Sequence, residues 1–408
     1  MSAERAEGLI RGKSVWEDET MKLRSALVVA ALLAAVPTPH AAAQETIKIG
    51  SSLGLTGYGS LTDGHWRDGL ELAIAAVNAK GGVLGKKFSL VYEDNKSTPQ
   101  EAVVVYRKMM SEDKVVAFDS GCISAGNFAA ASFVTKAKLP MFLCSILPRQ
   151  PDEQKWAFSF LPPPKFEVES RYEYLKNKTD IRKIGILGDP SPYGMLMRNI
   201  AVEEAKNYGL EVAANESYQK DDADFSVQIG RVNAAGAGAI IMIGQGNALI
   251  TVSNNIKSLG LNKLLLLGSI QERELLLEAG KILGEQFLFP SPMIQLAVDD
   301  LNMISDAKAR AAAEAFLTPL KAKHGDKVDT SQTSRAWDSL LMMAKALEAA
   351  KTTEGTAVRD AFEKIGQYVG AGAPYEFSPE QHVGITKNPY LIAYVKDGKL
   401  IIRYDGRQ

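Results

Sequence analysis

Small hydroxyl residues follow an apolar run in the segment Val115–Asn127, whose sequence is VVAFDSGCISAGN. The run predicts a buried strand, the glycine a turn, and Ala129–Lys138 a helix. This order places backbone N–H groups and the Ser124 hydroxyl at a helix N-terminus, where unpaired donors and the helix dipole favour an anion. The segment therefore predicts a binding site for the charged end of a small carboxylate.

A second copy of this arrangement follows at once. Leu139–Leu143 is another short apolar run, and Cys144–Pro148 is the turn after it. Two neighbouring parallel strands bring their following loops to one edge of a sheet, where ligands of open α/β sheets bind. The ligand-binding candidates in these two loops are Ser120, Cys122, Ile123, Ser124, Ser145, Ile146 and Leu147.

Enzymatic chemistry finds little support in the chain. It contains no G-x-S-x-G, H-E-x-x-H or P-loop motif, and none of its four histidines pairs with a nucleophile at a recognisable spacing. The glycine loop Gly54–Gly59 follows a strand but lacks the G-x-G-x-x-G spacing and the acidic residue of a dinucleotide site. Two cysteines allow neither a disulfide scaffold nor a cysteine metal cluster. We therefore expect no enzyme, no cofactor and no metal.

Composition describes ordinary globular material. The chain has 408 residues, a formal net charge of −1, and 46% hydrophobic and 23% charged residues. This length predicts two or three domains. The balanced charge gives no reason to expect nucleic acid or an anionic membrane as a partner.

The region before residue 44 predicts export. Met21–Ala43 combines a basic start, an apolar run from Ala26 to Val36, and small residues at the cleavage-determining positions, which together indicate a secretory signal peptide. The apolar run is too short to span a bilayer. No cysteine follows the cleavage site, so we expect no lipid anchor there. Residues 1–20 are charged and unlike a signal, and a start codon assigned too early explains them most simply.

Strand and helix signals alternate along the mature chain. The first part predicts strands and helices in the order Thr46–Ser51 strand, Asp68–Ala79 helix, Lys87–Glu93 strand and Pro99–Ser111 helix, followed by the two strand-loop units. Such a βαβα alternation indicates a parallel doubly wound sheet. The prolines of Leu161–Pro164 interrupt it, and a second βα series then runs to Leu267.

Two similar α/β lobes in tandem are therefore predicted. Prolines at Phe289–Pro292 mark a second crossing between them, and a third is expected near Gly370–Pro374. Residues 44–162 and 293–372 would form lobe I, and residues 163–292 and 373–408 lobe II. Tyr390–Val395 and Leu400–Tyr404 flank an Asp-Gly turn and predict a hairpin. Three strands linking the lobes would make a hinge.

The runs IKIGSSLGLTGYG, GLELAIAAVNAKGGVLGKKFSLVYEDNKSTP and LPMFLCS resemble the type I periplasmic binding proteins of the branched-chain amino acid transporter family. The resemblance covers nearly all of residues 45–408, and its most specific part is Gly69–Pro99. It implies a two-lobed clamp that closes on a solute in the periplasm and delivers it to the membrane permease of an ABC transporter. We expect a monomer with a carboxylate or amino acid ligand.

The resemblance also assigns residues. The family's carboxylate-holding serine falls on Ser124, the backbone donors of the next loop on Ser145 and Leu147, and the aromatic residue of the second lobe on Tyr193. Leu147 replaces a threonine that amino acid binders often have. The acidic residue that would hold an α-ammonium group falls on Ile270.

Loss of that acid would leave a ligand ammonium desolvated and unpaired, at a cost of roughly several kcal/mol. A solute without an ammonium group is therefore favoured, such as an aromatic or aliphatic acid. Asp63, Asp189 or Glu272 are alternatives that could supply the missing charge.

Several candidates have a structural alternative. Ser124 could be only a helix cap, Tyr193 could pack beneath its loop, and His65 and Trp66 are more consistent with a structural role. Tyr58, Gln245, Ser269 and Gln271 are further ligand-binding candidates because they lie in loops that follow strands. Cys122 and Cys144 could form a disulfide, but we favour two small buried thiols that line the pocket.

Two other functions fit less well. A periplasmic sensor subunit for amides, urea or amino acids would keep the fold and signal instead of transporting. An exported oxidoreductase would need a bound cofactor.

Overall fold

The computed structural model describes residues 46–145, 155–190, 192–219, 222–244, 248–267, 272–325 and 328–406. The predicted signal peptide and residues 1–20 lie outside this part of the chain, as do Ile146, Leu147, Gln245, Ser269, Ile270 and Gln271. Within the described ranges, no helix is both long and apolar enough to cross a membrane.

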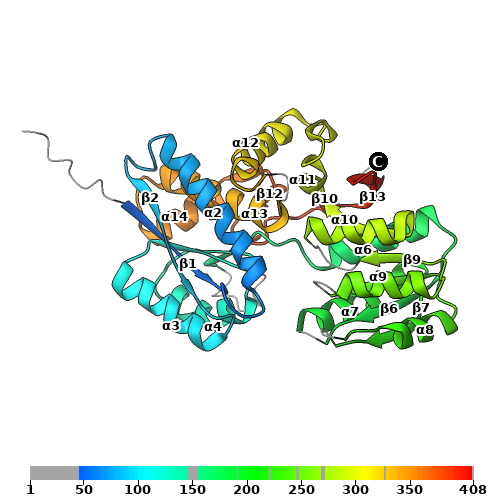
Figure 1. The fold of residues 1–408 in the computed structure, drawn as a ribbon. Helices are drawn as coiled ribbons and strands as arrows, with labels where there is room; N and C mark the ends of the chain where they lie inside the picture. The colour runs from blue at the N-terminus through cyan, green and yellow to red at the C-terminus, as the bar shows by residue number, and fades with distance from the viewer. Residues whose placement is uncertain are drawn as a thin grey trace, which may run out of the picture. The chain divides into compact units, whose positions relative to one another are not determined.

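The first sheet has five parallel strands in the order β2-β1-β3-β4-β5 (Figure 1). Its strands are β1 (Thr46–Leu53), β2 (Lys87–Asp94), β3 (Ala117–Ser120), β4 (Met141–Leu143) and β5 (Ala157–Ser159). β3 and β4 are neighbours in register, with Ser120 beside Leu143. The two predicted ligand loops therefore leave the same edge of the sheet.

Helices cover both faces of this sheet. On one face, α3 (Pro99–Lys108) and α4 (Ser124–Lys136) pack against the strands through residues such as Tyr106 and Val134. The other core holds α2 (Ser60–Ala79), α12 (Ala307–His324), α13 (Ser331–Ala350) and α14 (Gly355–Glu363). The βα alternation and the doubly wound architecture predicted from the sequence are confirmed.

The second sheet has seven strands in the order β14-β13-β10-β9-β8-β6-β7. Five of them are parallel, namely β6 (Lys183–Gly188), β7 (Glu211–Ser217), β8 (Ala239–Ile243), β9 (Leu264–Leu267) and β10 (Phe287–Pro292). Two cores again lie on opposite faces. One contains α6 (Lys165–Lys178) and α7 (Pro192–Ala205), and the other α8 (Ser226–Ala234), α9 (Ala248–Ser258) and α10 (Arg273–Leu283).

The predicted C-terminal hairpin is also present. β13 (Tyr390–Lys396) and β14 (Lys399–Tyr404) pair antiparallel, and β13 pairs antiparallel with β10. Asp397 and Gly398 both have positive φ, 52° and 73°, as a type I′ turn requires. The chain thus ends by extending the second sheet.

Between β10 and β13, the chain returns to the first lobe for a longer segment than the sequence predicts. After β10, α11 (Met293–Ala297) places Ile294 in the core of the first lobe. The crossing expected near Gly370–Pro374 is wrong, since β11 (Gly366–Val369) and β12 (Pro374–Phe377) form an antiparallel pair there. Tyr375, Phe377 and Ile385 pack in the first core, so the chain leaves that lobe only after residue 385.

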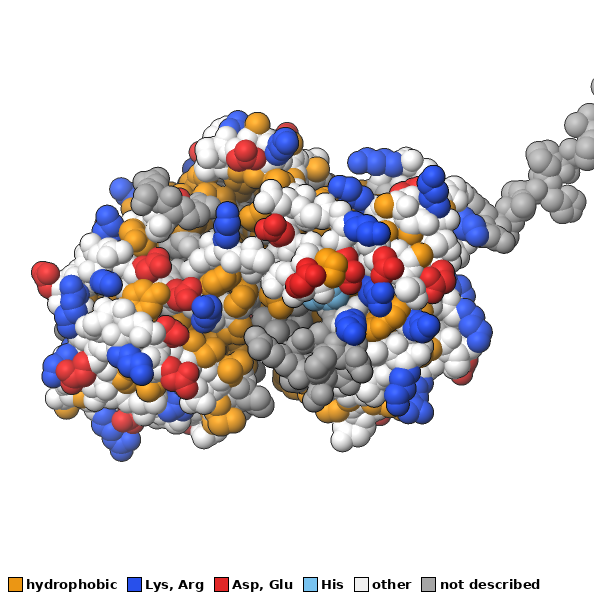
Figure 2. Space-filling view, turned by 180° about the vertical axis from the view of Figure 1, so that it is seen from behind, with side chains coloured by type: hydrophobic (Ala, Val, Ile, Leu, Met, Phe, Trp, Pro, Cys, Tyr) orange, Lys and Arg blue, Asp and Glu red, His pale blue; other side chains and the backbone are white. Residues whose placement is uncertain are grey.

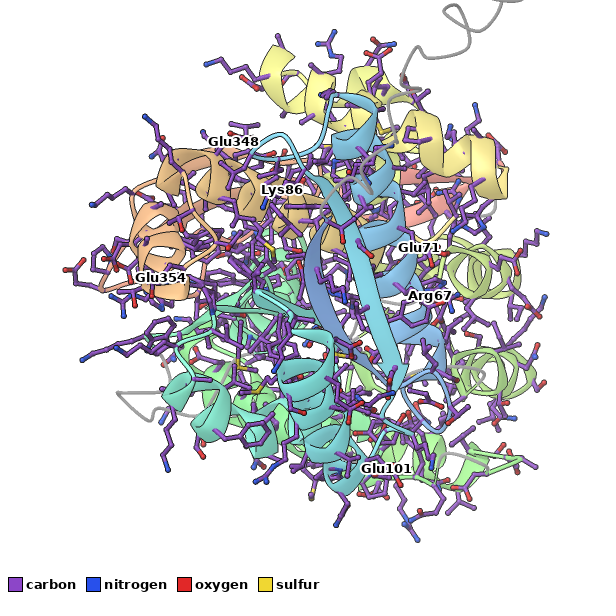
Figure 3. The ribbon with its side chains drawn as sticks, turned by 90° about the vertical axis from the view of Figure 1, so that its left-hand side faces the viewer. Arg67, Glu71, Lys86, Glu101, Glu348 and Glu354 are labelled. Carbon is purple, nitrogen blue, oxygen red and sulfur yellow. A yellow bond between two sulfur atoms is a disulfide. The ribbon has the colours of Figure 1, made fainter. Side chains whose placement is uncertain are left out.

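Charged side chains of both signs are interspersed on the molecular face of Figure 2, as the net charge of −1 suggests. On α2, Arg67 and Glu71 lie one turn apart with 3.7 Å between Nε and Oε1 (Figure 3). Glu348 of α13 accepts a hydrogen bond from the Leu84 backbone N–H at 2.7 Å, which fixes the turn before β2.

Candidate functional site

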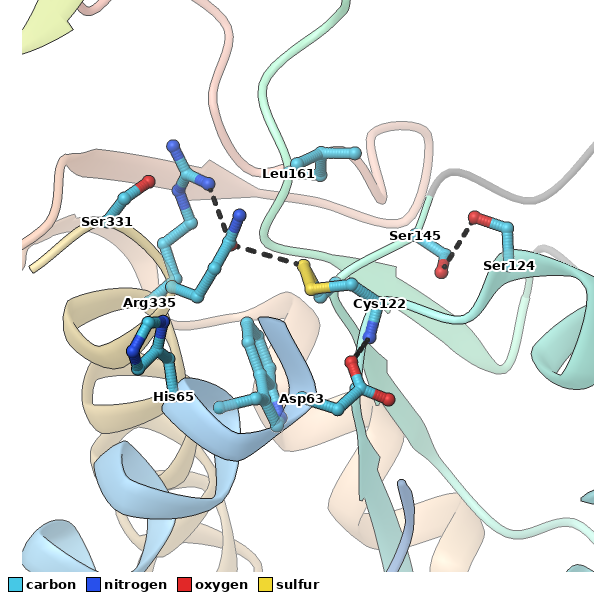
Figure 4. The surroundings of a disulfide bond; sticks show 12 residues. Asp63, His65, Cys122, Ser124, Ser145, Leu161, Ser331 and Arg335 are labelled. Carbon is cyan, nitrogen blue, oxygen red and sulfur yellow. Dashed lines mark hydrogen bonds between the residues drawn. A yellow bond between two sulfur atoms is a disulfide. The ribbon is translucent and has the colours of Figure 1, made fainter. Parts of the chain in front are cut away.

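The two predicted loops bring Ser124 and Ser145 together. Their hydroxyl oxygens are 3.3 Å apart (Figure 4). The Asn127 side-chain amide donates to Ser145 Oγ at 2.9 Å. One hydroxyl hydrogen makes the bond between the serines, so the other is left for a third group. The juxtaposition predicted from the strand order is confirmed, whereas contact with a ligand stays a prediction.

Ser124 is the first residue of α4, and Ile123 holds the cap position without a side-chain cap bond. Ser124 is therefore not the helix cap that was its structural alternative. Within the described chain, the backbone N–H groups of Ser124 and Ala125 donate to no carbonyl, while those of Gly126 and Asn127 bond to Ile123. Free N–H groups at a helix start, next to a hydroxyl pair, suit an anion.

Cys122 and Cys144 form a disulfide with their Cα atoms 4.5 Å apart, so the favoured expectation of two free thiols is wrong. The geometry follows from the sheet, because β3 and β4 end side by side and each cysteine lies just beyond its strand. The Cys144 sulfur is 3.3 Å from Gln332 Oε1 of α13. In Figure 4, Ser124 and Ser145 lie to one side of the disulfide, and Ser331 and Arg335 to the other.

Asp63 of α2 supports the loops that follow β1 and β3. It is fully buried and its two oxygens accept the backbone N–H groups of Gly54 at 2.7 Å and Cys122 at 2.6 Å. Burial raises its pKa to about 6, although the two hydrogen bonds oppose the rise. Because its side chain is fully buried and both of its oxygens bond to the loops, the structure gives Asp63 a supporting role.

Ile123 and Ser120 also support the loops. The Ile123 side chain is 4% exposed and packs against the glycine loop, where a Cβ on Gly59 would come within 2.0 Å of it. Ser120 is fully buried and its hydroxyl accepts from the Ser52 backbone N–H at 3.2 Å. Both were predicted as ligand contacts, and the structure gives both of them packing roles.

Asp119 and Trp66 form a second buried brace. The Trp66 indole and the Ser339 hydroxyl donate to the two Asp119 oxygens at 3.1 and 2.6 Å. Burial raises the pKa of Asp119 to about 8. The structural alternative for Trp66 is thereby confirmed. His65 lies on the same helix, with Nδ1 3.7 Å from Asp329 Oδ1.

The second sheet presents Tyr193 near its carboxyl edge. Tyr193 lies in the first turn of α7, after β6, and is 36% exposed. Its hydroxyl interacts with Glu167, whose pKa is raised by burial, and opposes that rise in a small part. Asp189 is buried against the same turn, where a Cβ on Gly194 would meet its Oδ1 at 2.2 Å.

Tyr58, on the glycine loop of the first lobe, is 70% exposed.

A buried ionic cluster of Glu167, Arg171, Arg335 and Tyr390 was not predicted. Tyr390 donates to Glu167 Oε1 at 3.4 Å. Burial raises the pKa of Glu167 to about 7, although the charges of Arg171 and Arg335 oppose the rise. Its sequence signal was the i, i+4 spacing of Glu167 and Arg171 on a helix that directly follows the prolines of the first crossing.

The fold and these loops together define a class of two-lobed solute-binding proteins. The sequence model of the family described as periplasmic binding protein matches residues 46–399, so the chain belongs to that family. Its relatives include "Leu/Ile/Val-binding protein homolog 7" of Brucella melitensis, 24% identical over 393 residues that cover 93% of this chain and 95% of the relative.

Solved structures show the same fold. A type 1 periplasmic binding protein from Bordetella pertussis has a TM-score of 0.70 at 24% identity and covers 88% of this chain and all of its own. LivJ of Streptococcus pneumoniae, solved with isoleucine, has a TM-score of 0.69 at 22% identity and covers 87% of this chain and 98% of its own. An extracellular ligand-binding receptor from Rhodopseudomonas palustris HaA2 reaches 0.74 at 21% identity, covering 88% and 100%.

Proposed function

We propose that this chain is the periplasmic substrate-binding component of an ABC importer and that it binds a small carboxylate solute. The observation that carries the proposal is the donor set at the start of α4. The Ser124–Ser145 hydroxyl pair lies beside two backbone N–H groups that no described residue accepts. Such a set matches a carboxylate, whose oxygens accept several hydrogen bonds at once.

The fold supplies the mechanism. The first lobe holds the carboxylate with Ser124 and Ser145, and the second lobe contributes Tyr193. Closure of the lobes about the crossing segments then buries the solute, as in other hinge-closing binding proteins. The closed form presents the permease with a surface that the open form lacks. The candidates that lie outside the described residues, Ile146, Leu147, Gln245, Ser269 and Gln271, stay predictions.

The donor set is sufficient for the micromolar solute affinity that we expect of a transport protein. A dissociation constant of 1 μM corresponds to about −8 kcal/mol. Hydrogen bonds to a charged group contribute about 1.5–3 kcal/mol each, and burial of a hydrocarbon body adds about 25 cal/mol per Å². A few such bonds and a modest apolar body therefore reach micromolar binding.

A thermal-shift screen identifies the solute class, because a ligand that binds only the folded protein raises its melting temperature. The panel contains aromatic acids, aliphatic acids and branched-chain amino acids. The amino acids belong in it because the relatives are homologues of Leu/Ile/Val-binding proteins and LivJ holds isoleucine. We expect carboxylates without an ammonium group to give the largest shifts.

Calorimetry on Ser124→Ala then tests the site with the best ligand. We expect binding at least tenfold weaker than in the wild type and an unchanged melting temperature without ligand. Ser132→Ala, on an exposed position of the same helix, is the matched control and should bind normally. Equal affinity in Ser124→Ala and the control would remove Ser124 from the site.

A further inference from the structure

Arg171 of α6 is a fully buried cation with unused donors. Its side chain is 0% exposed, and one guanidinium nitrogen, Nη1, donates to the Leu267 carbonyl at 3.1 Å. The other two, Nε and Nη2, are buried and have no hydrogen-bond partner among the described residues. A buried unsatisfied donor costs free energy, and for a charged group this cost is large, so each such group in a native structure calls for an explanation.

The unused atoms form a recognition edge. Nε–H and Nη2–H point in parallel from one side of the planar guanidinium, which is the arrangement that binds both oxygens of a carboxylate. Leu267 is the last residue of β9, so the guanidinium lies at the carboxyl edge of the second sheet. Ligands of α/β sheets bind at that edge.

The surroundings contain a second buried arginine, Arg335, and further unpaired groups. The charges of Arg171 and Arg335 both lower the pKa of Glu167, Arg335 also lowers that of Asp338, and Glu167 Oε2 has no hydrogen-bond partner in the described chain. Thr330 and Ser331, at the start of α13 and one turn from Arg335, have hydroxyls that are buried and unpaired. Tyr193 lies close enough for its charge to affect the pKa of Arg171.

We propose that Arg171, assisted by Arg335, is a second anion subsite of the solute site and that the solute is a dicarboxylate. This inference rests on the proposed function: one carboxylate binds Ser124 and Ser145, and the other binds the Nε–Nη2 edge of Arg171. A zwitterionic amino acid would instead bring its ammonium group toward a guanidinium. The two positive charges would repel each other.

Matched acids test the proposal on the unmodified protein. The pairs are adipate with hexanoate and terephthalate with benzoate, extended by the dicarboxylates from succinate to suberate because the best length is set by the distance between the two subsites. We expect at least one dicarboxylate to bind tenfold or more tightly than its monocarboxylate partner in calorimetry. Equal or tighter binding of the monocarboxylates would overturn the proposal.

Arg171→Gln shows whether the preference comes from this side chain. We expect the variant to lose at least tenfold in affinity for the dicarboxylate and less than threefold for its monocarboxylate partner, so the preference disappears. Arg171→Lys keeps the charge without the two-donor edge and should give an intermediate affinity. A merely structural role would weaken both acids alike.

Arg273→Gln is the matched control. Arg273 is another buried arginine of the second lobe, but it is paired with Asp299 and with the Gln295 carbonyl. We expect its replacement to leave the ratio of the two affinities unchanged. If Arg171→Gln does not fold, Arg171→Lys takes its place, and a dicarboxylate preference equal to that of the wild type would contradict the Arg171 subsite.

The outcomes separate the two proposals. If only monocarboxylates or a branched-chain amino acid bind tightly, the proposed function stands and the Arg171 subsite is contradicted. If no carboxylate of either panel raises the melting temperature, the proposed function fails together with the inference. A dicarboxylate preference that survives in Arg171→Gln would place the second subsite elsewhere.

Discussion

The carboxyl edges of the two sheets differ in how completely their polar groups are paired. At the first edge, Asp63 accepts two backbone N–H groups, Asn127 bridges Ser145 and the Gly121 carbonyl, and a disulfide joins the two loops. At the second edge, Arg171 and Glu167 have buried atoms for which the described part of the chain offers no hydrogen-bond partner. One edge is braced before any ligand arrives, and the other carries unsatisfied charge.

This difference suggests that the two edges have different roles in binding. A rigid, pre-organised donor set lowers the entropy cost of binding a carboxylate, a group that many solutes share. The carboxyl edge of the second sheet would then discriminate between solutes, because its buried groups become paired only with a matching ligand. A ligand that lacks the matching group leaves those groups unpaired, which is a strong basis for rejection.

Removal of the disulfide should have the largest effect on the first edge. Cys122 and Cys144 are separated by 22 residues, and a loop of that size corresponds to about 3 kcal/mol of stabilisation. We expect Cys122→Ser/Cys144→Ser to lose about this much in urea unfolding and to bind its solute more weakly. The wild type under reductant should match the variant, and the variant should not respond to reductant. An unchanged unfolding midpoint would show that the brace is dispensable.

Asp63→Asn tests the brace beneath the loops and should have the next largest effect. The amide oxygen can accept only one of the two N–H groups, and the amide nitrogen would face the other. We expect a loss of about 2 kcal/mol in the free energy of unfolding and weaker solute binding. Glu71→Gln on the same helix, which removes two partly exposed ion pairs, with Arg67 and Lys323, should cost less than about 1 kcal/mol. Equal effects of the two changes would contradict the role of Asp63.

The pH dependence of stability should report the titration of the buried carboxyl groups. Burial raises the pKa of Asp119 from 3.8 to about 8, so the folded protein holds this proton more tightly than the unfolded chain. The free energy of unfolding should therefore fall as pH rises from about 4 to 8. Asp63 and Asp338, with pKa values raised to about 6 and about 7, add to the slope over narrower ranges.

Asp119→Asn removes the largest of these contributions. Urea unfolding at pH 5 and pH 8.5 should show a smaller difference between the two conditions in the variant than in the wild type. An identical difference would mean that Asp119 does not titrate in this range.

Local patterns predicted much of the fold and the first edge of the site. Buried parallel strands are continuous apolar runs, such as Ala239–Ile243, and the Asp-Gly turn at residues 397–398 specifies its hairpin. Ser124 and Ser145 could be paired from strand order alone, since neighbouring parallel strands end at one edge.

What escaped prediction depends on distances between segments far apart in the chain. The disulfide needed the separation of two strand ends, which spacing along the sequence does not give. Tyr375 and Phe377 belong to the first core because their aromatic rings pack against Phe160 and Phe362. Arg335 meets Glu167 only because the chain returns to the first lobe between them.

A crystal structure with the solute bound tests the central claim most directly. The account predicts a carboxylate within about 3 Å of Ser124 Oγ and of the free N–H groups at the start of α4. A solute whose carboxylate lies away from both serines, or an uncharged part of the solute at the α4 start, would contradict it.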